Sequence, residues 1–405
     1  MHLIPDAYLQ LARRSFYSNL PIHNVSRIAL LFRTLSDSPD LAHFIRRLSI
    51  CIPTAQLDAF HAPSIKEDGE GTKSPAEALR SIFHSLPRLS SLRISGFNAS
   101  FLFAHVPSST TSSIALPLRN LHLQSITSLE LNAGARRNEL IAKDLRLMLL
   151  NLRGLTKLFL VGYESSKEEE LELDERTSIA QRTRSTKLLP LRARTQLATL
   201  SIRQSSMSPE DLHTLLGFVA PDQLRRLEII DFHQNNLPPT LLSLSPRVSS
   251  LLSSVISLRI ALFNYSSPDV DAGEVVDRLL RHLDKLEKLD LGGSTVSSSL
   301  LNTLPPTVRE LGLFGTSMKR DTMASFLDGL RSQKDSFAAG GSGKLERRVH
   351  ATTHSEPRWE MESRLRVLEV RGGHVAADWR GAKAWEIQRR CWEAGVVWKG
   401  DARNW

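Results

Sequence analysis

Three groups of side chains have types and spacings that could support chemistry. Gly340-Gly341-Ser342-Gly343-Lys344 matches the end of a phosphate-binding loop, in which backbone N–H groups hold phosphates and the lysine binds them. His350 and His354 have the spacing of two zinc ligands. Cys51 and Cys391 are the two candidate thiol nucleophiles. Each group would indicate a different kind of catalytic or cofactor site.

The surrounding residues complete none of these sites. A phosphate-binding loop needs a glycine five positions before Gly343, where Ala338 stands, and Ser or Thr after its lysine, where Leu345 stands. The histidine pair lacks a second pair of ligands, and neither cysteine has a local nucleophile signature. The G-x-S-x-G pattern of a hydrolase nucleophile is also missing. We therefore predict a protein that is not an enzyme and uses no metal or cofactor.

The charge of the chain allows acidic partners without identifying one. It has 405 residues, a formal net charge of +9 and a sequence pI of about 9.7. The basic residues are scattered as short pairs such as Arg225-Arg226 and form no long Lys/Arg block. Such scattering is typical of a solvated basic surface, so the sequence does not favour nucleic acid as a partner.

Nothing in the sequence predicts a membrane-bound or secreted protein. It contains no apolar run of about 18 residues, the length that would span a bilayer. Residues 1–11 lack the basic region and apolar core of a signal peptide. Two distant cysteines indicate a reducing compartment. We therefore expect a cytoplasmic or nuclear protein.

The element that must position any recognition surface is a recurring short strand. Residues 283–293 read L-x-x-L-x-x-L-x-L, so Leu289 and Leu291 point to one face of a strand, whereas Lys288 and Asp290 point to the other. One such unit cannot bury its apolar side alone, so the pattern must recur. It does recur, at 45–50, 89–94, 155–160, 197–202, 224–229, 255–260, 308–313 and 365–370. Residues 118–123 and 126–131 also fit but lie too close together to be two repeats, so they remain alternatives.

This pattern is the signature of leucine-rich repeats. It predicts an α/β leucine-rich-repeat horseshoe, a ribonuclease-inhibitor-like solenoid with parallel strands on the concave face and helices on the convex face. The helices expected between strands lie at 74–86, 138–150, 208–219 and 273–283, and two more precede the array at 6–17 and 25–35. The predicted domains are a helical segment at 1–44, the array at 45–370 with insertions at 164–194 and 333–359, and a tryptophan-rich cap at 371–405.

The predicted cap rests on aromatic residues. All six tryptophans lie at or after Trp359. Ala384, Trp385, Ile387, Cys391 and Trp392 share one broad side of a helix. The last repeat of a solenoid exposes an apolar end that large side chains would cover. A ligand-binding aromatic patch is the alternative.

The start of the chain resembles the junction between the F-box and the first repeat of fungal F-box/leucine-rich-repeat proteins. The resemblance lies in Phe32-Arg33-Thr34-Leu35, Pro39-Asp40-Leu41-Ala42 and Ile45-Arg46-Arg47-Leu48, after a helix at 7–20. The F-box of that family opens with an L-P-x-E helix, which has no counterpart here. The resemblance therefore implies the end of an F-box within residues 1–44.

The candidate binding residues are the outward-pointing side chains of the strands, which would form a ladder on the concave face. The first strands carry mainly basic residues, whereas the later strands mix signs. An acidic segment of a partner would be attracted to the basic part, with Phe159 as an apolar anchor. The predicted contacts are Arg47, Arg93, Lys157, Phe159, Arg203, Glu228, Arg259 and Asp290.

These observations predict protein–protein recognition by a repeat surface. The resemblance implies a substrate receptor of a cullin–RING ubiquitin ligase, with a cullin-adaptor subunit as a further partner. An alternative stays open, because similar horseshoes activate small GTPases through an asparagine-rich or arginine-bearing rim. No motif in this sequence supports that alternative.

Overall fold

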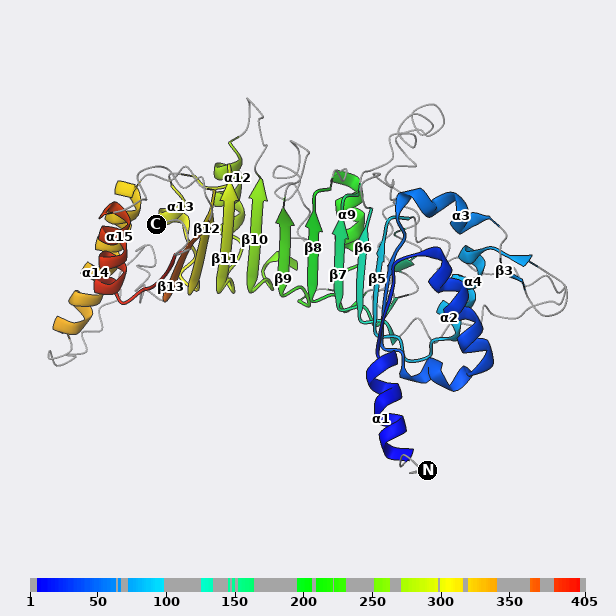
Figure 1. The fold of residues 1–405 in the computed structure, drawn as a ribbon. Coiled ribbons are helices and arrows are strands. Elements are labelled where there is room, and N and C mark those ends of the chain that lie inside the picture. Colours follow the sequence, from blue (N-terminus) through cyan, green and yellow to red (C-terminus); the bar gives the residue numbers. More distant parts are fainter. Residues whose placement is uncertain are drawn as a thin grey trace, which may run out of the picture. The chain divides into compact units, whose positions relative to one another are not determined.

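The computed structural model describes two compact units, Met1–Leu224 and Arg225–Trp405, here called unit 1 and unit 2 (Figure 1). Each unit is described by itself. The residues whose structure is described are 6–62, 65–66, 72–97, 125–133, 145, 148–149, 152–163, 195–205, 209–220, 222–230, 251–262, 271–297, 299–315, 320–340, 365–371 and 382–400.

Unit 1 starts with a helical region that precedes the repeats. Its elements are α1 (Asp6–Tyr17), β1 (Asn19–Ile22), α2 (Val25–Asp37), a 3-10 turn (Pro39–Phe44), β2 (Arg47–Cys51), a second 3-10 turn (Thr54–Gln56), α3 (Leu57–His61), the hairpin strands β3 (Ile65–Lys66) and β4 (Thr72–Lys73), and α4 (Pro75–Ser85). The predicted capping box opens α4. The Glu77 N–H donates to Ser74 Oγ at 3.2 Å, and the Ser74 N–H donates to Glu77 Oε2 at 2.8 Å.

Apart from the antiparallel β3–β4 pair, the described strands of unit 1 form one parallel sheet in chain order. After β2 come β5 (Ser91–Ser95), β6 (Ser128–Asn132), β7 (Lys157–Val161) and β8 (Thr199–Arg203), and β1 pairs with the outer edge of β2. Helix α9 (Pro209–Gly217) follows β8. Parallel neighbours need a long crossover, and here each crossover is the rest of a repeat.

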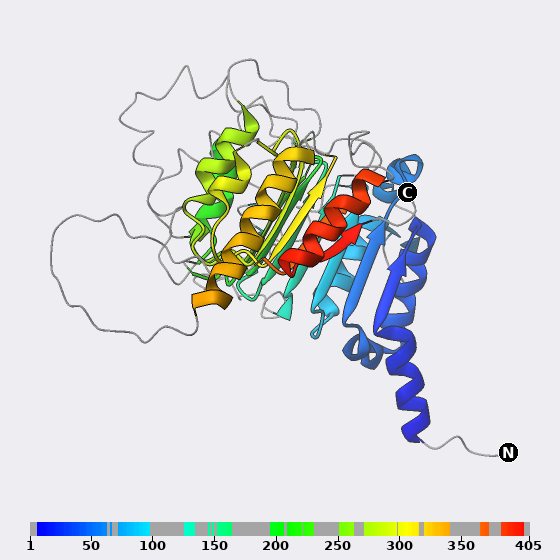
Figure 2. The same ribbon diagram turned by 90° about the vertical axis from the view of Figure 1, so that its left-hand side faces the viewer.

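Unit 2 repeats the same plan. Its parallel strands are β9 (Arg226–Ile230), β10 (Ser257–Leu262), β11 (Lys288–Gly293), β12 (Glu310–Phe314), β13 (Val367–Arg371) and β14 (Val397–Gly400), again in chain order. Its helices are α12 (Ala272–Leu280), α13 (Leu300–Thr303), α14 (Arg320–Gly340) and α15 (Ala382–Ala394). Figure 2 shows α12, α14 and α15 along one side of the strands.

Leucine and isoleucine at the second and fourth strand positions build the core. The second-position residues Leu48, Leu92, Leu129, Leu158 and Leu200 are in register in unit 1, as are Leu227, Leu258, Leu289, Leu311 and Leu368 in unit 2, and none is more than 1% exposed. Burying each such side chain stabilises the fold by roughly 1.5–3 kcal/mol. The predicted α/β leucine-rich-repeat class, with a parallel sheet that has helices packed on one of its two faces, is therefore confirmed.

A left-handed residue ends several strands. Gly96, Gly162 and Gly315 directly follow their strands, and Gly293 is the last residue of β11; their φ angles lie between +58° and +92°. Gln204 directly follows β8 with φ of 48°. Glycine adopts this conformation without steric cost. At Gly96 a side chain is also excluded by space, because an added Cβ would lie 2.3 Å from the carbonyl oxygen of Ile52. This turn directs the chain away from the sheet and into the next repeat.

Several elements differ from the sequence-based predictions. Of the two closely spaced strand candidates, 126–131 supplies the repeat strand β6, whereas 118–123 lies outside the described residues. Strands β1 and β14 had not been predicted, because neither has the leucine spacing. Helix α14 runs to Gly340 and so includes the start of the predicted insertion 333–359. The predicted insertion 164–194 lies outside the described residues.

Within the described part, no helix is long and apolar enough to cross a membrane.

Candidate protein-binding surface

The first, third and fifth residues of each strand point away from the leucine core and form what we call the open face of each unit. In β2 these residues are Arg47, Ser49 and Cys51, which are exposed or half-buried, whereas Leu48 and Ile50 between them are buried. The same alternation holds in β5, β6 and β7. The open face is thus the surface that the sequence predicted as concave, and its side chains project from paired strands.

In unit 1 the predicted contact residues form three parallel rows rather than one ladder. Arg47 and Lys157 are both first-position residues, Arg93 and Phe159 are third-position residues, and Arg203 is in the fifth position. Neighbouring strands lie about 4.8 Å apart. The rows therefore spread these side chains over a two-dimensional surface.

Basic residues outnumber acidic residues on the open face of unit 1. Among the described strand residues that point outward, Arg47, Arg93, Lys157 and Arg203 are basic and Glu130 is acidic. We call these four the basic patch. Arg93 Nε lies 3.3 Å from Glu130 Oε1, with side chains 55% and 32% exposed, so part of its charge is compensated. The sequence missed this pair because it left open which candidate was the strand.

The other three basic side chains stay exposed on that surface. Arg47, Lys157 and Arg203 are all exposed. Arg203 bends back along its own strand, because its Nε donates to Ser201 Oγ at 3.2 Å. Phe159 is half-buried in the row of third-position residues, in register with Glu130 and Ser201. The open face of unit 1 thus carries both exposed cations and an aromatic ring.

In unit 2 the open face is dominated by charges that pair with one another. Glu228 has a side chain only 1% exposed, because two arginines cover it. Arg259 Nη1 donates to Glu228 Oε1 at 3.3 Å, and Arg226 Nη2 lies 3.7 Å from Glu228 Oε2. Glu228 therefore orients Arg259 and presents little surface of its own to a partner.

The guanidinium of Arg259 also lies over an aromatic ring that sequence reasoning missed. Its carbon is 5.0 Å from the centroid of Phe314, a fifth-position residue of β12. Gly292 lies beside that ring, since an added Cβ would be 2.3 Å from a ring carbon. The sequence feature that could have indicated this contact is the pair Gly292 and Gly312, which lie inside two strands. A glycine in a strand often marks a position where another group comes close to the backbone.

The remaining predicted contact of unit 2 is also held by its neighbours. The carboxylate of Asp290 lies over Gly312, where an added Cβ would be 2.1 Å from Asp290 Oδ1. Beside it, Lys288 Nζ donates to Glu310 Oε2 at 2.8 Å. This bond raises the pKa of Lys288 and lowers the pKa of Glu310. Most charged side chains on this face are therefore paired with opposite charges of unit 2 itself.

The described residues contain no group of three or more His, Cys, Asp and Glu side chains that could hold a metal ion. Burial raises the pKa of the Cys391 thiol to about 12, so the nucleophilic thiolate is scarce at neutral pH. His350, His354 and the glycines 341 and 343 lie outside the described residues. The surface can offer charge, hydrogen bonds and aromatic contact.

Comparisons with known proteins give a limited likeness to solved structures. No family model matches the chain, and no curated protein matches it. Among solved structures, the chain is similar to one described as the crystal structure of the Rad7 and Elc1 complex in yeast. The identity is 16%, the match covers 77% of this chain and 90% of that chain, and the TM-score is 0.30.

Proposed function

We propose that this protein is a non-enzymatic recognition module that binds a partner protein through the basic patch of unit 1. The observation that carries the proposal is the contrast between the two open faces. Unit 1 exposes Arg47, Lys157 and Arg203 on the open face that also carries Phe159, whereas unit 2 compensates Glu228, Lys288 and Glu310 with charges of its own. A surface on which exposed side chains of one charge sign outnumber the other is suited to a partner of opposite charge.

The partner suited to this surface carries an acidic segment next to an apolar residue. Exposed cations attract such a segment over distances up to the Debye length, about 8 Å at physiological salt. Exposed charge raises the association rate more than the affinity. The apolar residue would pack on Phe159, whose desolvation would supply the dissociation barrier that charge alone lacks.

Affinity purification with quantitative mass spectrometry tests this proposal. The variant Arg47→Glu/Lys157→Glu removes two cations of the patch. Its control, Arg27→Glu/Arg33→Glu, makes the same charge change at exposed positions of α2. We expect the first variant to lose a set of acidic partners that the control retains. Equal recovery by both variants would contradict the proposal.

We further propose that the bound protein is a ubiquitin-ligase substrate and that α1 contacts a cullin-adaptor subunit. In support, α1 exposes apolar side chains at helical spacing, with Tyr8 66%, Leu11 64% and Phe16 78% exposed. Such a stripe on a surface helix is typical of a docking face. The ligase step would then belong to the partners.

The two contacts can be separated by mutation. Leu11→Asp/Phe16→Asp should remove a cullin adaptor from the purified complexes while the partner of the basic patch remains. Retention of the adaptor by this variant would contradict the role of α1. If a small GTPase were recovered instead, and this protein accelerated its GTP hydrolysis, the GTPase-activating alternative would replace the ligase proposal.

A further inference from the structure

The strands of unit 1 begin along an edge that carries exposed arginines. The described residues at and before the starts of β2, β5, β6 and β7, here called the entry segments, are 45–47, 86–91, 125–128 and 152–157. These strands are parallel and paired in register, so the entry segments lie side by side at one edge of the sheet. They contain Arg46, Arg88 and Arg153, which we call the entry arginines, and all three are exposed.

The charged side chains of the entry segments are all basic. Besides the entry arginines, the segments carry Arg47 and Lys157 of the basic patch, and none of their residues is Asp or Glu. Asp37 and Asp40, which are exposed before β2, lie outside the segments. None of the ion pairs found among the described residues involves an entry arginine. The edge therefore extends the basic surface of unit 1 beyond the open face.

Backbone oxygens of this edge are occupied by donors of the sheet itself. The Arg46 carbonyl accepts bonds from the Ser90 N–H at 2.8 Å and from Ser90 Oγ at 3.1 Å. The Ser90 carbonyl accepts a bond from Thr127 Oγ1 at 3.2 Å, and the Thr127 carbonyl accepts one from Thr156 Oγ1 at 3.0 Å. A carbonyl oxygen is an acceptor and would repel an anion if it were unsatisfied. An anion can therefore meet the arginines without opposition from these three carbonyls.

In unit 2 the corresponding segments mix charges of both signs. Residues 284–288 and 306–310 lie at and before the starts of β11 and β12. Together they carry the acidic residues Asp284, Glu287 and Glu310 and the basic residues Lys285, Lys288 and Arg309. Opposite charges so close together exert little net attraction on an anionic segment. The one-signed edge is thus a property of unit 1.

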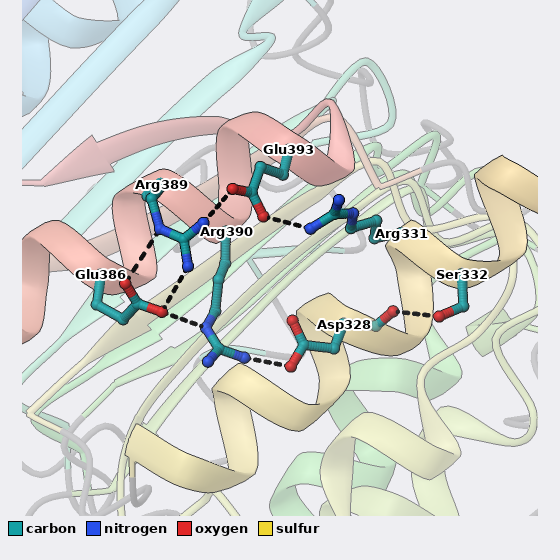
Figure 3. Close-up of polar contacts among 7 residues, drawn as sticks. All are labelled: Asp328, Arg331, Ser332, Glu386, Arg389, Arg390 and Glu393. Atoms are coloured by element: carbon teal, nitrogen blue, oxygen red, sulfur yellow. Dashed lines mark hydrogen bonds and ion pairs between the residues drawn. The ribbon is translucent and has the colours of Figure 1, made fainter.

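The end of unit 2 also differs, because its arginines are paired with carboxylates. Arg331 Nη1 of α14 donates to Glu393 Oε2 of α15 at 2.7 Å, and further pairs connect these helices (Figure 3). On α15, Ile387 is buried, whereas Trp385 and Trp392 of the predicted cap are 64% and 80% exposed. This end therefore offers aromatic side chains and paired charges, which do not suit an acidic segment.

We propose that the acidic segment bound by unit 1 crosses the strands along this edge, from β2 to β7, with acidic residues at its positions i and i+4. Arg47 and Lys157 are in register on β2 and β7, about 14 Å apart at roughly 4.8 Å per strand. An extended polypeptide rises about 3.3 Å per residue and alternates its side chains, so residues i and i+4 lie about 13 Å apart on one side. One acidic residue then meets Arg46 and Arg47, and the other meets Arg153 and Lys157. This inference rests on the proposed function, because it assigns the path of the same segment.

A polypeptide suits this edge better than a nucleic acid. Strand β6 lies between the two ends, and the described residues 125–132 include Glu130 and no Lys or Arg. A nucleic acid carries a charge on every phosphate, so it would place a negative charge over this stretch. Residues i+1 to i+3 of a polypeptide can be neutral there.

Fluorescence anisotropy of the full chain with labelled, capped peptides tests the spacing, at about 10 mM salt, where the Debye length is about 30 Å. The first peptide has Asp-Glu pairs at its positions 1–2 and 5–6, and the second has the same composition with the pairs at 1–2 and 3–4. We expect the first to bind about threefold more tightly, because its charges reach both ends of the edge. Equal affinities would overturn the spacing of four residues.

Reversal of the entry arginines tests the path itself. Arg88→Glu/Arg153→Glu should weaken binding of the first peptide about tenfold, because two exposed cations become anions. The control Arg27→Glu/Arg33→Glu makes the same charge change on α2 and should change the affinity by less than about twofold. Equal effects of the two variants would show that the segment does not follow the edge.

Two further comparisons separate this inference from the proposed function and from a nucleic acid partner. If Arg47→Glu/Lys157→Glu weakened binding while Arg88→Glu/Arg153→Glu matched the control, the path would be wrong and the proposed function would stand. If the peptide did not bind, or if no variant weakened its binding, both would fall. A five-nucleotide oligothymidylate, which has four phosphates, should bind more weakly than the first peptide. Tighter binding of the oligonucleotide, lost in Arg88→Glu/Arg153→Glu, would replace the acidic segment by a nucleic acid.

Discussion

The guanidinium carbon of Arg259 lies 5.0 Å from the ring centroid of Phe314, although the two residues belong to β10 and β12 with β11 between them. The contact is possible because β11 places Gly292 beside the ring. Glu228 holds the other side of the guanidinium. The Arg259 side chain is 31% exposed, and the ring contact of such a partly buried cation is worth about 1 kcal/mol.

Gly292→Ala should therefore destabilise unit 2 through Phe314. The added Cβ would overlap the ring, and overpacking of this kind costs about 1–3 kcal/mol. In a Phe314→Ala background the same substitution should cost much less, because the overlapping atoms are gone. Urea denaturation of the four proteins measures this coupling. Strictly additive effects would contradict the described placement of the ring.

Gly96→Ala should be costly where a matched glycine substitution is not. Gly96 has a φ of +92°, and an added Cβ would lie 2.3 Å from the Ile52 carbonyl oxygen, so we expect a loss of about 2 kcal/mol or more. At Gly217 in α9 nothing lies within 4 Å of an added Cβ, and alanine should be neutral or stabilise by up to about 1 kcal/mol. Equal thermal melting of both variants would contradict the turn geometry.

Leu158→Ala and Leu30→Ala remove the same atoms from opposite environments within unit 1. Leu158 is 0% exposed in the leucine core, so its truncation should cost about 2–5 kcal/mol. Leu30 is 65% exposed on α2, and its truncation should stay within about 0.5 kcal/mol. The free energies of unfolding from denaturant titration check this. Similar losses at the two sites would contradict the assignment of inner and outer faces.

The leucine spacing predicts the repeat strands correctly because their cores are periodic. A strand side chain points inward at every second residue, so Leu289 and Leu291 are readable from the sequence alone. Strand β14 was missed because Trp398 replaces the leucine of the pattern. The helical spacing grouped Trp385 with Ile387 but could not tell which part of that broad side faces the core.

Contacts between strands were beyond prediction. Whether Arg93 meets Glu130, or Arg259 meets Phe314, depends on the register between repeats of unequal length. The sequence therefore indicated a ladder of charges but not which charges compensate one another. The two open faces differ because charges pair across the strands of unit 2, whereas exposed basic residues outnumber acidic ones in unit 1.

The ion pairs of α15 should make stability depend on pH in the acid range. Bonds from Arg389 and Arg390 lower the pKa of Glu386 from 4.5 to about 2. A carboxyl with a lowered folded-state pKa stabilises the fold above its unfolded pKa, and this contribution is lost as pH falls from about 4.5 to about 2. The difference in melting temperature between wild type and Glu386→Gln should be largest near neutral pH and shrink across that window. A difference that stayed constant down to acid pH would contradict the pairing.

Binding kinetics to the acidic partner recovered with the wild-type chain, measured over a series of salt concentrations, test the central claim most directly. Arg47→Glu/Lys157→Glu should slow association roughly tenfold at low salt and flatten its salt dependence, because the attracting charge is reversed. Phe159→Ala should mainly speed dissociation, costing about 2 kcal/mol of affinity. The control Arg27→Glu/Arg33→Glu should leave both rates nearly unchanged. If the control slowed association as much as the patch variant does, or if neither changed it, the open face of unit 1 would not be the binding surface.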